Sequence, residues 1–309
     1  MDVRSALQNT KLFQNLELLA GQVVEGFISG IHKSPFHGFS AEFAEHKIYN
    51  PGESTKHIDW KLFARTDKLY TKRYEEETNL RCHMILDNSP SMYFPQIDQL
   101  SSEHLHKLGF GVLAIAALMT LLKKQRDAVG LSVYSNTYSF YAPEKSSERH
   151  FQMLLAQLNG LVSPGKTEGT TKTYQFLHQI AEKMHRRSLL FVFSDMLQTE
   201  VEEQQLFEAL RHLKYNKHEV VLFHLLDQRL EADFDFDNTP KRFLDVETGL
   251  HVDLHAEQVR EGYKVAMEGY LKRLKLQCMR YHIRYRPVDI HADFSTVLNT
   301  FLVERQKFG

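Results

Sequence analysis

The segment "LRCHMILDNSPSM", residues 80–92, decides how the rest of the chain is interpreted. Its first part is a nearly continuous apolar run with the length of a buried strand, and the run ends at Asp87. Ser89 and Ser91 follow at alternate positions, with Pro90 between them. Asn, Pro and Ser are ordinary turn formers. The segment is therefore either a simple turn or the first half of a metal site at the end of a strand.

A second strand of the same kind, "SLLFVFSD" (188–195), is equally apolar and ends at Asp195. From residue 80 onward, such runs alternate with segments of helical periodicity, among them "LGFGVLAIAALMTLL" (108–122). Continuous apolar strands are expected where helices cover both faces of a sheet. The pattern predicts an α/β fold with a doubly wound, mostly parallel central sheet and helices on both faces.

The chain divides into two parts by composition. Residues 1–79 contain a predicted helix and an extended segment rich in Gly, Ser, Pro and aromatic residues, and we expect this section to pack on the core. Residues 80–309 form the α/β domain. Within it, 227–254 is less regular and acidic, and its Gly249 with alternating flanks predicts a small β insertion.

Composition excludes several classes of function. The chain has 309 residues, 42% of them hydrophobic, and a net charge of -1, which gives no basis for a nucleic-acid partner. The run 108–122 is shorter than the roughly 20 apolar residues that span a bilayer, so it predicts a buried helix and no membrane insertion. Cys82 and Cys278 are far apart, and no apolar signal-peptide region begins the chain. We therefore expect a cytoplasmic protein, with its 17 scattered histidines mostly on the surface or on helices.

The two acids predict a common site. The carboxyl ends of parallel strands meet at one edge of the sheet, where doubly wound folds bind ligands. A loop before a predicted helix, "TEGTTKT" (167–173), can bring Thr170 or Thr171 to the same edge. An all-oxygen shell with few charges suits Mg²⁺, with Mn²⁺ or Ca²⁺ as alternatives, and it leaves a position open for an acidic side chain of a partner protein. The predicted metal ligands are Asp87, Ser89, Ser91, Thr170 or Thr171, and Asp195.

This D-x-S-x-S motif, with the threonine loop and Asp195, resembles the metal-ion-dependent adhesion site (MIDAS) of von Willebrand factor A domains. The resemblance favours Thr171 over Thr170, because Thr173 and Leu177 then fall at apolar helix positions of that family. Asp195 has a simpler alternative role, since an acid is also favoured near a helix N-terminus.

The block upstream, residues 49–79, is similar to the bacterial domain of unknown function 58 family. The matching positions are Tyr49, Pro51, Gly52, Ile58, Asp59, Trp60, Ala64, Arg65 and Glu77. Glu53 and Lys56 depart from the pattern, where an Asp and an Arg are usual. The resemblance implies a non-catalytic protein-binding module whose partner is a MoxR-type AAA+ ATPase. Asp59 and Arg65 are expected to pair and fix the N-terminal section on the core.

Two other functions stay open. "GLVSPGKT" (160–167) fits the P-loop pattern of a nucleotide-binding enzyme, but a P-loop follows a strand and opens a helix. Here the preceding residues have helical periodicity, and the next predicted helix starts several residues later. No order of Ser, His and Asp indicates a hydrolase, so we do not expect an enzyme. The remaining alternative is a structural α/β protein with a vestigial metal site.

Overall fold

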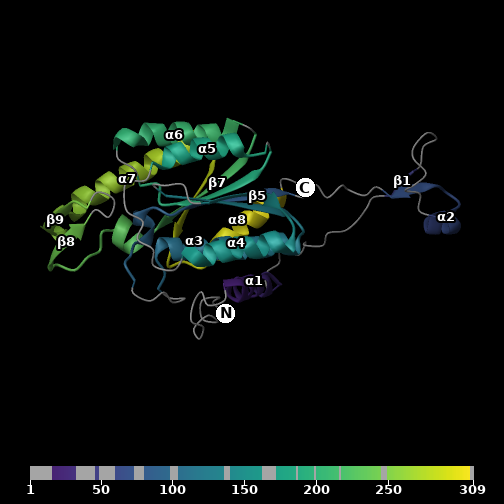
Figure 1. Ribbon diagram of the computed structural model, residues 1–309, viewed down its shortest axis with the longest axis horizontal. Coiled ribbons are helices and arrows are strands. Elements are labelled where there is room, and N and C mark those ends of the chain that lie inside the picture. Colours follow the sequence, from purple (N-terminus) through teal and green to yellow (C-terminus); the bar gives the residue numbers. More distant parts are fainter. Residues whose placement is uncertain are drawn as a thin grey trace.

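The computed structural model in Figure 1 describes residues 16–32, 46–48, 60–72, 80–97, 104–135, 140–161, 172–185, 187–197, 200–215, 217–244 and 249–306. The strands are β1 (His46–Ile48), β2 (Tyr70–Lys72), β3 (Arg81–Asp87), β4 (Ala128–Tyr134), β5 (Phe140–Lys145), β6 (Leu189–Ser194), β7 (Glu219–Leu226), β8 (Pro240–Leu244), β9 (His251–His255) and β10 (Arg284–Asp289). The α-helices are α1 (Leu16–His32), α2 (Trp60–Thr66), α3 (Lys107–Lys124), α4 (Glu148–Leu161), α5 (Thr173–Lys183), α6 (Glu200–Tyr215), α7 (Ala256–Arg280) and α8 (Ser295–Gln306). Two single turns complete the structure, the 3-10 turn η3 (Pro90–Tyr93) and the π turn η4 (Gln228–Ala232).

The central sheet has six strands in the order β10-β7-β6-β3-β4-β5. All neighbours in it are parallel except β5, which pairs antiparallel with β4. The chain builds one half of the sheet outward from β3 through β4 and β5, and then crosses back to build the other half through β6, β7 and β10. The predicted fold class, a doubly wound and mostly parallel α/β sheet, is confirmed.

Two helical layers cover the faces of the sheet (Figure 1). Helices α1, α3, α4 and α8 lie on one face, and α5, α6 and α7 lie on the other. Alternate residues of β3 point into the two layers: Met84 packs in the core under α3, and Ile85 packs in the core under α5 and α6. Both faces are buried at the inner strands β3, β4, β6 and β7, which are therefore mostly apolar, whereas the edge strands β5 and β10 are partly exposed and carry charged residues.

Helix α3 explains the apolar run that follows the first strand. Nearly all its side chains from Lys107 to Leu122 are buried, because it lies between the sheet and the outer helices. A Cβ added at Gly111 would come within 3.0 Å of the Leu86 side chain, so the glycine lets the helix approach β3 closely. Among the described helices, none is both long and apolar enough to cross a membrane.

The less regular parts are two small antiparallel pairs. Strands β8 and β9 pair antiparallel in the region where a small β insertion is expected. In the N-terminal section, β1 pairs with β2, α2 lies between them in sequence, and α1 packs against α3. Helix α2 departs from the extended conformation expected for this section; residues 60–66 contain no Gly or Pro to prevent a helix. Asp59 lies outside the described residues, so its pairing with Arg65 stays a prediction.

A few histidines lie in the core, as exceptions to the expectation that most are on the surface or on helices. His83 on β3 and His224 on β7 are fully buried. Each has a hydrogen-bond partner for both ring nitrogens, and this satisfies the polar atoms that burial removes from water.

Candidate metal site

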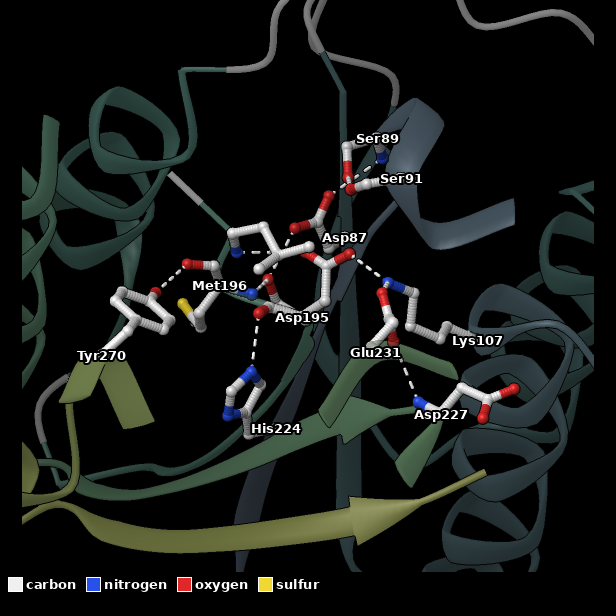
Figure 2. A network of polar contacts seen from close by, with 12 residues as sticks. Asp87, Ser89, Ser91, Lys107, Asp195, Met196, His224, Asp227, Glu231 and Tyr270 are labelled. Atoms are coloured by element: carbon white, nitrogen blue, oxygen red, sulfur yellow. Dashed lines mark hydrogen bonds and ion pairs between the residues drawn. The ribbon is translucent and has the colours of Figure 1, made fainter. Parts of the chain in front are cut away.

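The candidate site lies at the topological switch point of the sheet, between the carboxyl ends of β3 and β6. In the parallel register Leu86 is opposite Phe193, so Asp87 ends its strand beside Ser194. Asp195 directly follows β6. The structure thus brings the two acids to the same edge, as the parallel arrangement predicts (Figure 2). Asp195 is not at a helix N-cap, because the next helix starts at Glu200.

The D-x-S-x-S segment forms a tight turn that the aspartate itself holds. The Ser89 N–H donates to Asp87 Oδ1 at 2.9 Å, and the Asn88 N–H donates to the Tyr134 carbonyl at 2.7 Å. Pro90 then starts the turn η3, where its fixed φ and missing N–H cost nothing. This geometry places the Ser89 and Ser91 hydroxyl oxygens 3.0 Å apart beside Asp87 (Figure 2).

Asp87 lies at the centre of a buried hydrogen-bond network. Its Oδ2 accepts from the hydroxyl of Ser194 at 2.6 Å and from the hydroxyl of Tyr134 at 3.1 Å. Burial and the nearby charge of Asp195 raise the pKa of Asp87 from 3.8 to about 6, against the opposing effect of these hydrogen bonds. The carboxylate is therefore held in an environment that disfavours its negative charge.

Asp195 has a different partner, the ammonium group of a buried lysine. Lys107 Nζ lies 2.7 Å from Asp195 Oδ2, and neither side chain is more than 2% exposed. Burial alone would raise the pKa of Asp195, but the charge and hydrogen bond of Lys107 outweigh it and lower this pKa. Burial would likewise lower the pKa of Lys107, but Asp195 and Glu231 raise it. This is a fully formed internal ion pair.

The same ammonium group contacts a third carboxylate. Lys107 Nζ lies 2.5 Å from Glu231 Oε1 on the turn η4, and Glu231 Oε2 accepts from the Asp227 N–H at 2.9 Å. Burial and the charge of Asp195 raise the pKa of Glu231 despite the lysine. When Asp87, Asp195 and Glu231 are all ionised they carry three negative charges, and among the described residues Lys107 is the one ammonium group that contacts any of them.

The loop after β6 is fixed by contacts on both sides of Asp195 (Figure 2). The Met196 N–H donates to the Ser194 hydroxyl oxygen, and the Tyr270 hydroxyl donates to the Met196 carbonyl. Burial lowers the pKa of His224 to about 4, so its neutral ring donates from Nε2 to the Asp195 carbonyl at 2.7 Å. Met196 has a φ of 50°, a left-handed conformation that is unfavourable outside glycine and is often found at functional sites. The backbone is thus held in one position.

Thr170 and Thr171 lie outside the described residues, so their role as ligands stays a prediction. The helix that follows them, α5, begins at Thr173. The Thr173 side chain hydrogen bonds with the hydroxyl of Tyr134, which in turn donates to Asp87. Thr173, the first residue of α5, is thus connected to the site through Tyr134.

Sequence reasoning missed the internal cation of the site, Lys107, and the third carboxylate that contacts it, Glu231. Lys107 stands directly before the apolar run of α3, and a lysine at the start of a buried helix is a signal that it has an acidic partner. Glu231 lies in the less regular, acidic section 227–254, and nothing in that pattern marks it as a buried ion-pair partner; its side chain is only 11% exposed. Across the part of the chain that the structure describes, no group of three or more His, Cys, Asp or Glu is arranged to hold a metal ion.

The P-loop-like stretch does not have the context of a nucleotide site. Its first residues, Gly160 and Leu161, end the helix α4, whereas a P-loop follows a strand. Residues 162–171 lie outside the described part, and the next described helix starts at Thr173. The described geometry offers nothing in favour of a nucleotide.

Comparison with known proteins gives a family match and several distant similarities. Residues 45–270 match the family described as "Protein of unknown function DUF58". The chain is 22% identical over 233 residues to the uncharacterized proteins Mb1516 of Mycobacterium bovis and Rv1480 of Mycobacterium tuberculosis, covering 74% of this chain and 69% of each relative.

Among solved structures, the chain is similar to the conserved hypothetical protein BatB from Bacteroides thetaiotaomicron. The TM-score is 0.45 with 15% identity, over 74% of this chain and all of the other. An aerotolerance-related membrane protein from Bacteroides fragilis gives a TM-score of 0.40 with 15% identity, over 73% of this chain and 99% of the other.

Proposed function

Since the chain belongs to the DUF58 family, whose function is unknown, we propose that it is a divalent-cation-dependent protein-binding module without catalytic activity. The cation is Mg²⁺, with Mn²⁺ or Ca²⁺ as alternatives, bound at the MIDAS-like edge of the sheet. The partner supplies an acidic side chain to the cation. The observation that carries the proposal is the buried excess of negative charge at Asp87 and Asp195, beside two serine hydroxyls.

The donor set fits a small, hard cation. In an octahedron with metal–oxygen distances of about 2.1 Å, neighbouring oxygens lie roughly 3.0 Å apart. The hydroxyl oxygens of Ser89 and Ser91 are 3.0 Å apart, so the turn already has them at the spacing of two adjacent ligands. Oxygen donors of this kind select Mg²⁺, Mn²⁺ or Ca²⁺ over softer metals.

We expect the carboxylates of Asp87 and Asp195 to contact the metal ion through bound water molecules. Asp87 already accepts hydrogen bonds from Ser89, Ser194 and Tyr134, and Asp195 accepts from Lys107 and the Leu197 N–H. Each carboxylate still has lone pairs for a water molecule and supplies negative charge. Ser89 and Ser91, with Thr170 or Thr171, are then the direct protein ligands. The protein then supplies fewer ligands than an octahedral cation needs, so a carboxylate from a partner can occupy one of the remaining positions.

Lys107 defines the competing interpretation, a vestigial site in which an internal ammonium group replaces the metal. One ammonium group neutralises only one of the three acids. The pKa of Asp87 is raised first by its burial and then by the charge of Asp195, so its carboxylate has no cation that offsets these effects among the contacts that the structure describes. A divalent cation would match the two remaining charges, and this balance favours the metal site.

The test is calorimetric titration of Mg²⁺ and Mn²⁺ into the purified protein. We expect weak binding by the wild type, because the free site is incomplete, and loss of binding in Asp87→Ala. Asp253→Ala is the matched control, since Asp253 is an exposed aspartate on β9 paired with Arg242, and it should bind as the wild type does. Binding that survives in Asp87→Ala, or that depends equally on Asp253, contradicts the assigned site.

The partner we propose is a MoxR-type AAA+ ATPase in the cytoplasm of a bacterium. This rests on the family resemblance of the upstream block, residues 49–79, and of the D-x-S-x-S motif. Co-purification with such an ATPase from the same organism should require Mg²⁺, and should be lost with a chelator or in Asp87→Ala. If co-purification persists both with the chelator and in Asp87→Ala, the ATPase binds the protein without using the metal site.

A further inference from the structure

A second cluster of metal-ligating side chains lies away from the sheet edge, between helices α5 and α6. The two helices pack side by side on one face of the sheet (Figure 1). The Nδ1 atoms of His178 on α5 and His212 on α6 are 2.9 Å apart, and the ring centroids are 5.1 Å apart. Both histidines are half-buried. Two ring nitrogens from different helices are thus aimed at each other.

Each histidine has a glutamate one helical turn away. Glu182 follows His178 by four residues on α5, and Glu208 precedes His212 by four residues on α6. Residues four apart share a helix face. Both helices start near the carboxyl edge of the sheet and run back in the same direction, so the two exposed carboxylates flank the histidine pair from opposite ends.

The charges around His178 support this arrangement. Burial lowers the pKa of His178, and the charge of His212 lowers it further, while Glu208 and Glu182 act in the opposite direction. The ring is therefore neutral at pH 7, which is the form that binds a metal. In the metal-free protein one Nδ1 donates its proton to the other, because two neutral acceptor nitrogens would repel at this distance.

The spacing also suits a tetrahedral metal. Two nitrogens each about 2.0–2.1 Å from a tetrahedral Zn²⁺ lie roughly 3.3 Å apart. The observed 2.9 Å is only a few tenths of an ångström shorter, which small movements of the rings can supply. In the described part of the chain no third His, Cys, Asp or Glu is already in place around these nitrogens, so a carboxylate must turn toward them to complete the site.

We propose that His178 and His212 form a binding site for a divalent transition metal of the Zn²⁺ class, with Glu182 or Glu208 as a further ligand and water completing the shell. Each ring binds the metal through Nδ1 and carries its proton on Nε2. The ring that donates from Nδ1 in the metal-free protein therefore loses that proton to solvent and takes one up on its own Nε2. Nitrogen ligands favour Zn²⁺, Ni²⁺ and Cu²⁺ over Mg²⁺. The site is therefore chemically distinct from the oxygen-lined edge near Asp87, and it would tie α5 to α6.

The experiment is calorimetric titration of Zn²⁺ into the full chain in excess Mg²⁺, which keeps the oxygen-lined site out of the measurement. We expect about one equivalent of Zn²⁺ in the wild type. His178→Gln and His212→Gln should weaken binding by roughly a hundredfold or more, because each removes one of two placed nitrogens. One of Glu182→Gln and Glu208→Gln should weaken it by roughly tenfold, and this variant identifies the further ligand. Circular dichroism on each variant establishes that it is folded.

Two controls separate this site from others. His251→Gln removes an exposed histidine on β9 and should leave Zn²⁺ binding unchanged. Asp87→Ala should also leave it unchanged, so that failure of the Mg²⁺ site does not affect the result. The proposal is wrong if the folded wild type does not bind Zn²⁺, or if both histidine variants bind it as tightly as the wild type.

Discussion

Strand β3 carries a buried polar cluster at each end. Near its start, His83 Nδ1 lies 2.7 Å from Glu144 Oε1, and His83 Nε2 lies 2.7 Å from the Ser132 hydroxyl oxygen. At its other end, Asp87 lies in a network that includes Asp195, with Lys107 as the one ammonium group. The first cluster has one acid for one histidine. The second has more acids than cations.

The difference supports a structural role for the first cluster and the proposed metal-binding role for the second. Ser132, His83 and Glu144 have the contacts of a hydrolytic triad, but the side chains of His83 and Glu144 are at most 1% exposed and no substrate can reach them. A Cβ at Gly130 would lie 2.4 Å from His83 Nδ1, so the backbone of β4 closes over the ring. Geometry alone therefore does not identify a site. Uncompensated charge at a sheet edge that also presents hydroxyls is the better indicator.

The largest expected effect on stability is in the cluster around Asp87 and Asp195, at the carboxyl end of β3. Lys107→Met removes the ammonium group and leaves Asp195 and Glu231 buried without a cation, which should destabilise the protein by about 3–5 kcal/mol. Urea unfolding in the presence of a chelator measures this loss. Added Mg²⁺ should restore part of it, because the metal would supply the missing positive charge.

Lys123→Met is the matched control for Lys107→Met. Lys123 lies on the same helix but pairs with exposed Glu148, and such surface pairs contribute little. Equal destabilisation by the two variants would contradict the assignment of Lys107 as the internal cation of the site.

A smaller effect on stability is expected in the cluster of His83 and Glu144, near the start of β3. Glu144→Gln keeps the shape of the side chain but replaces a charged hydrogen bond to His83 with a neutral one, and should cost about 1–2 kcal/mol at pH 7. Burial opposes ionisation of Glu144, but the hydrogen bond and charge of His83 outweigh it and lower the pKa of Glu144 below 4.5. A carboxylate with a lowered folded-state pKa stabilises the protein above pH 4.5 and loses this contribution as the pH falls through the folded value.

The stability difference between the wild type and Glu144→Gln should therefore shrink as the pH falls below 4.5. Unfolding curves at several pH values test the sign. Mg²⁺ titration of the same variant should be unchanged, since the two clusters lie at opposite ends of the strand. Altered Mg²⁺ affinity would mean that the clusters are coupled.

The two ends also differ in how far the sequence predicts them. The carboxyl end is predictable because Asp87 and Asp195 end their strands, and parallel strands bring such residues together without knowledge of the packing. Lys107 and Glu231 could not be paired from the sequence, because they are far apart in the chain and meet only through the packing of η4 against the start of α3. His83, Ser132 and Glu144 lie on three strands, and the antiparallel pairing of β5 sets their contact. The sequence signals for strands and helices are local, whereas these contacts depend on the tertiary arrangement.

The sharpest contrast between the two clusters comes from one serine in each of them. Ser91→Ala removes a half-buried hydroxyl that contacts the Ser89 hydroxyl and hydrogen bonds with Asp195, so it should cost about 1 kcal/mol but weaken Mg²⁺ binding by roughly tenfold or more. Ser132→Ala leaves His83 Nε2 without its partner in the core and should cost about 1–3 kcal/mol while Mg²⁺ binding stays intact. Urea unfolding and calorimetry on both variants give four values. If Ser91→Ala affects stability alone, the carboxyl end is as structural as the amino end, and the charge excess at Asp87 has a purpose other than binding a cation.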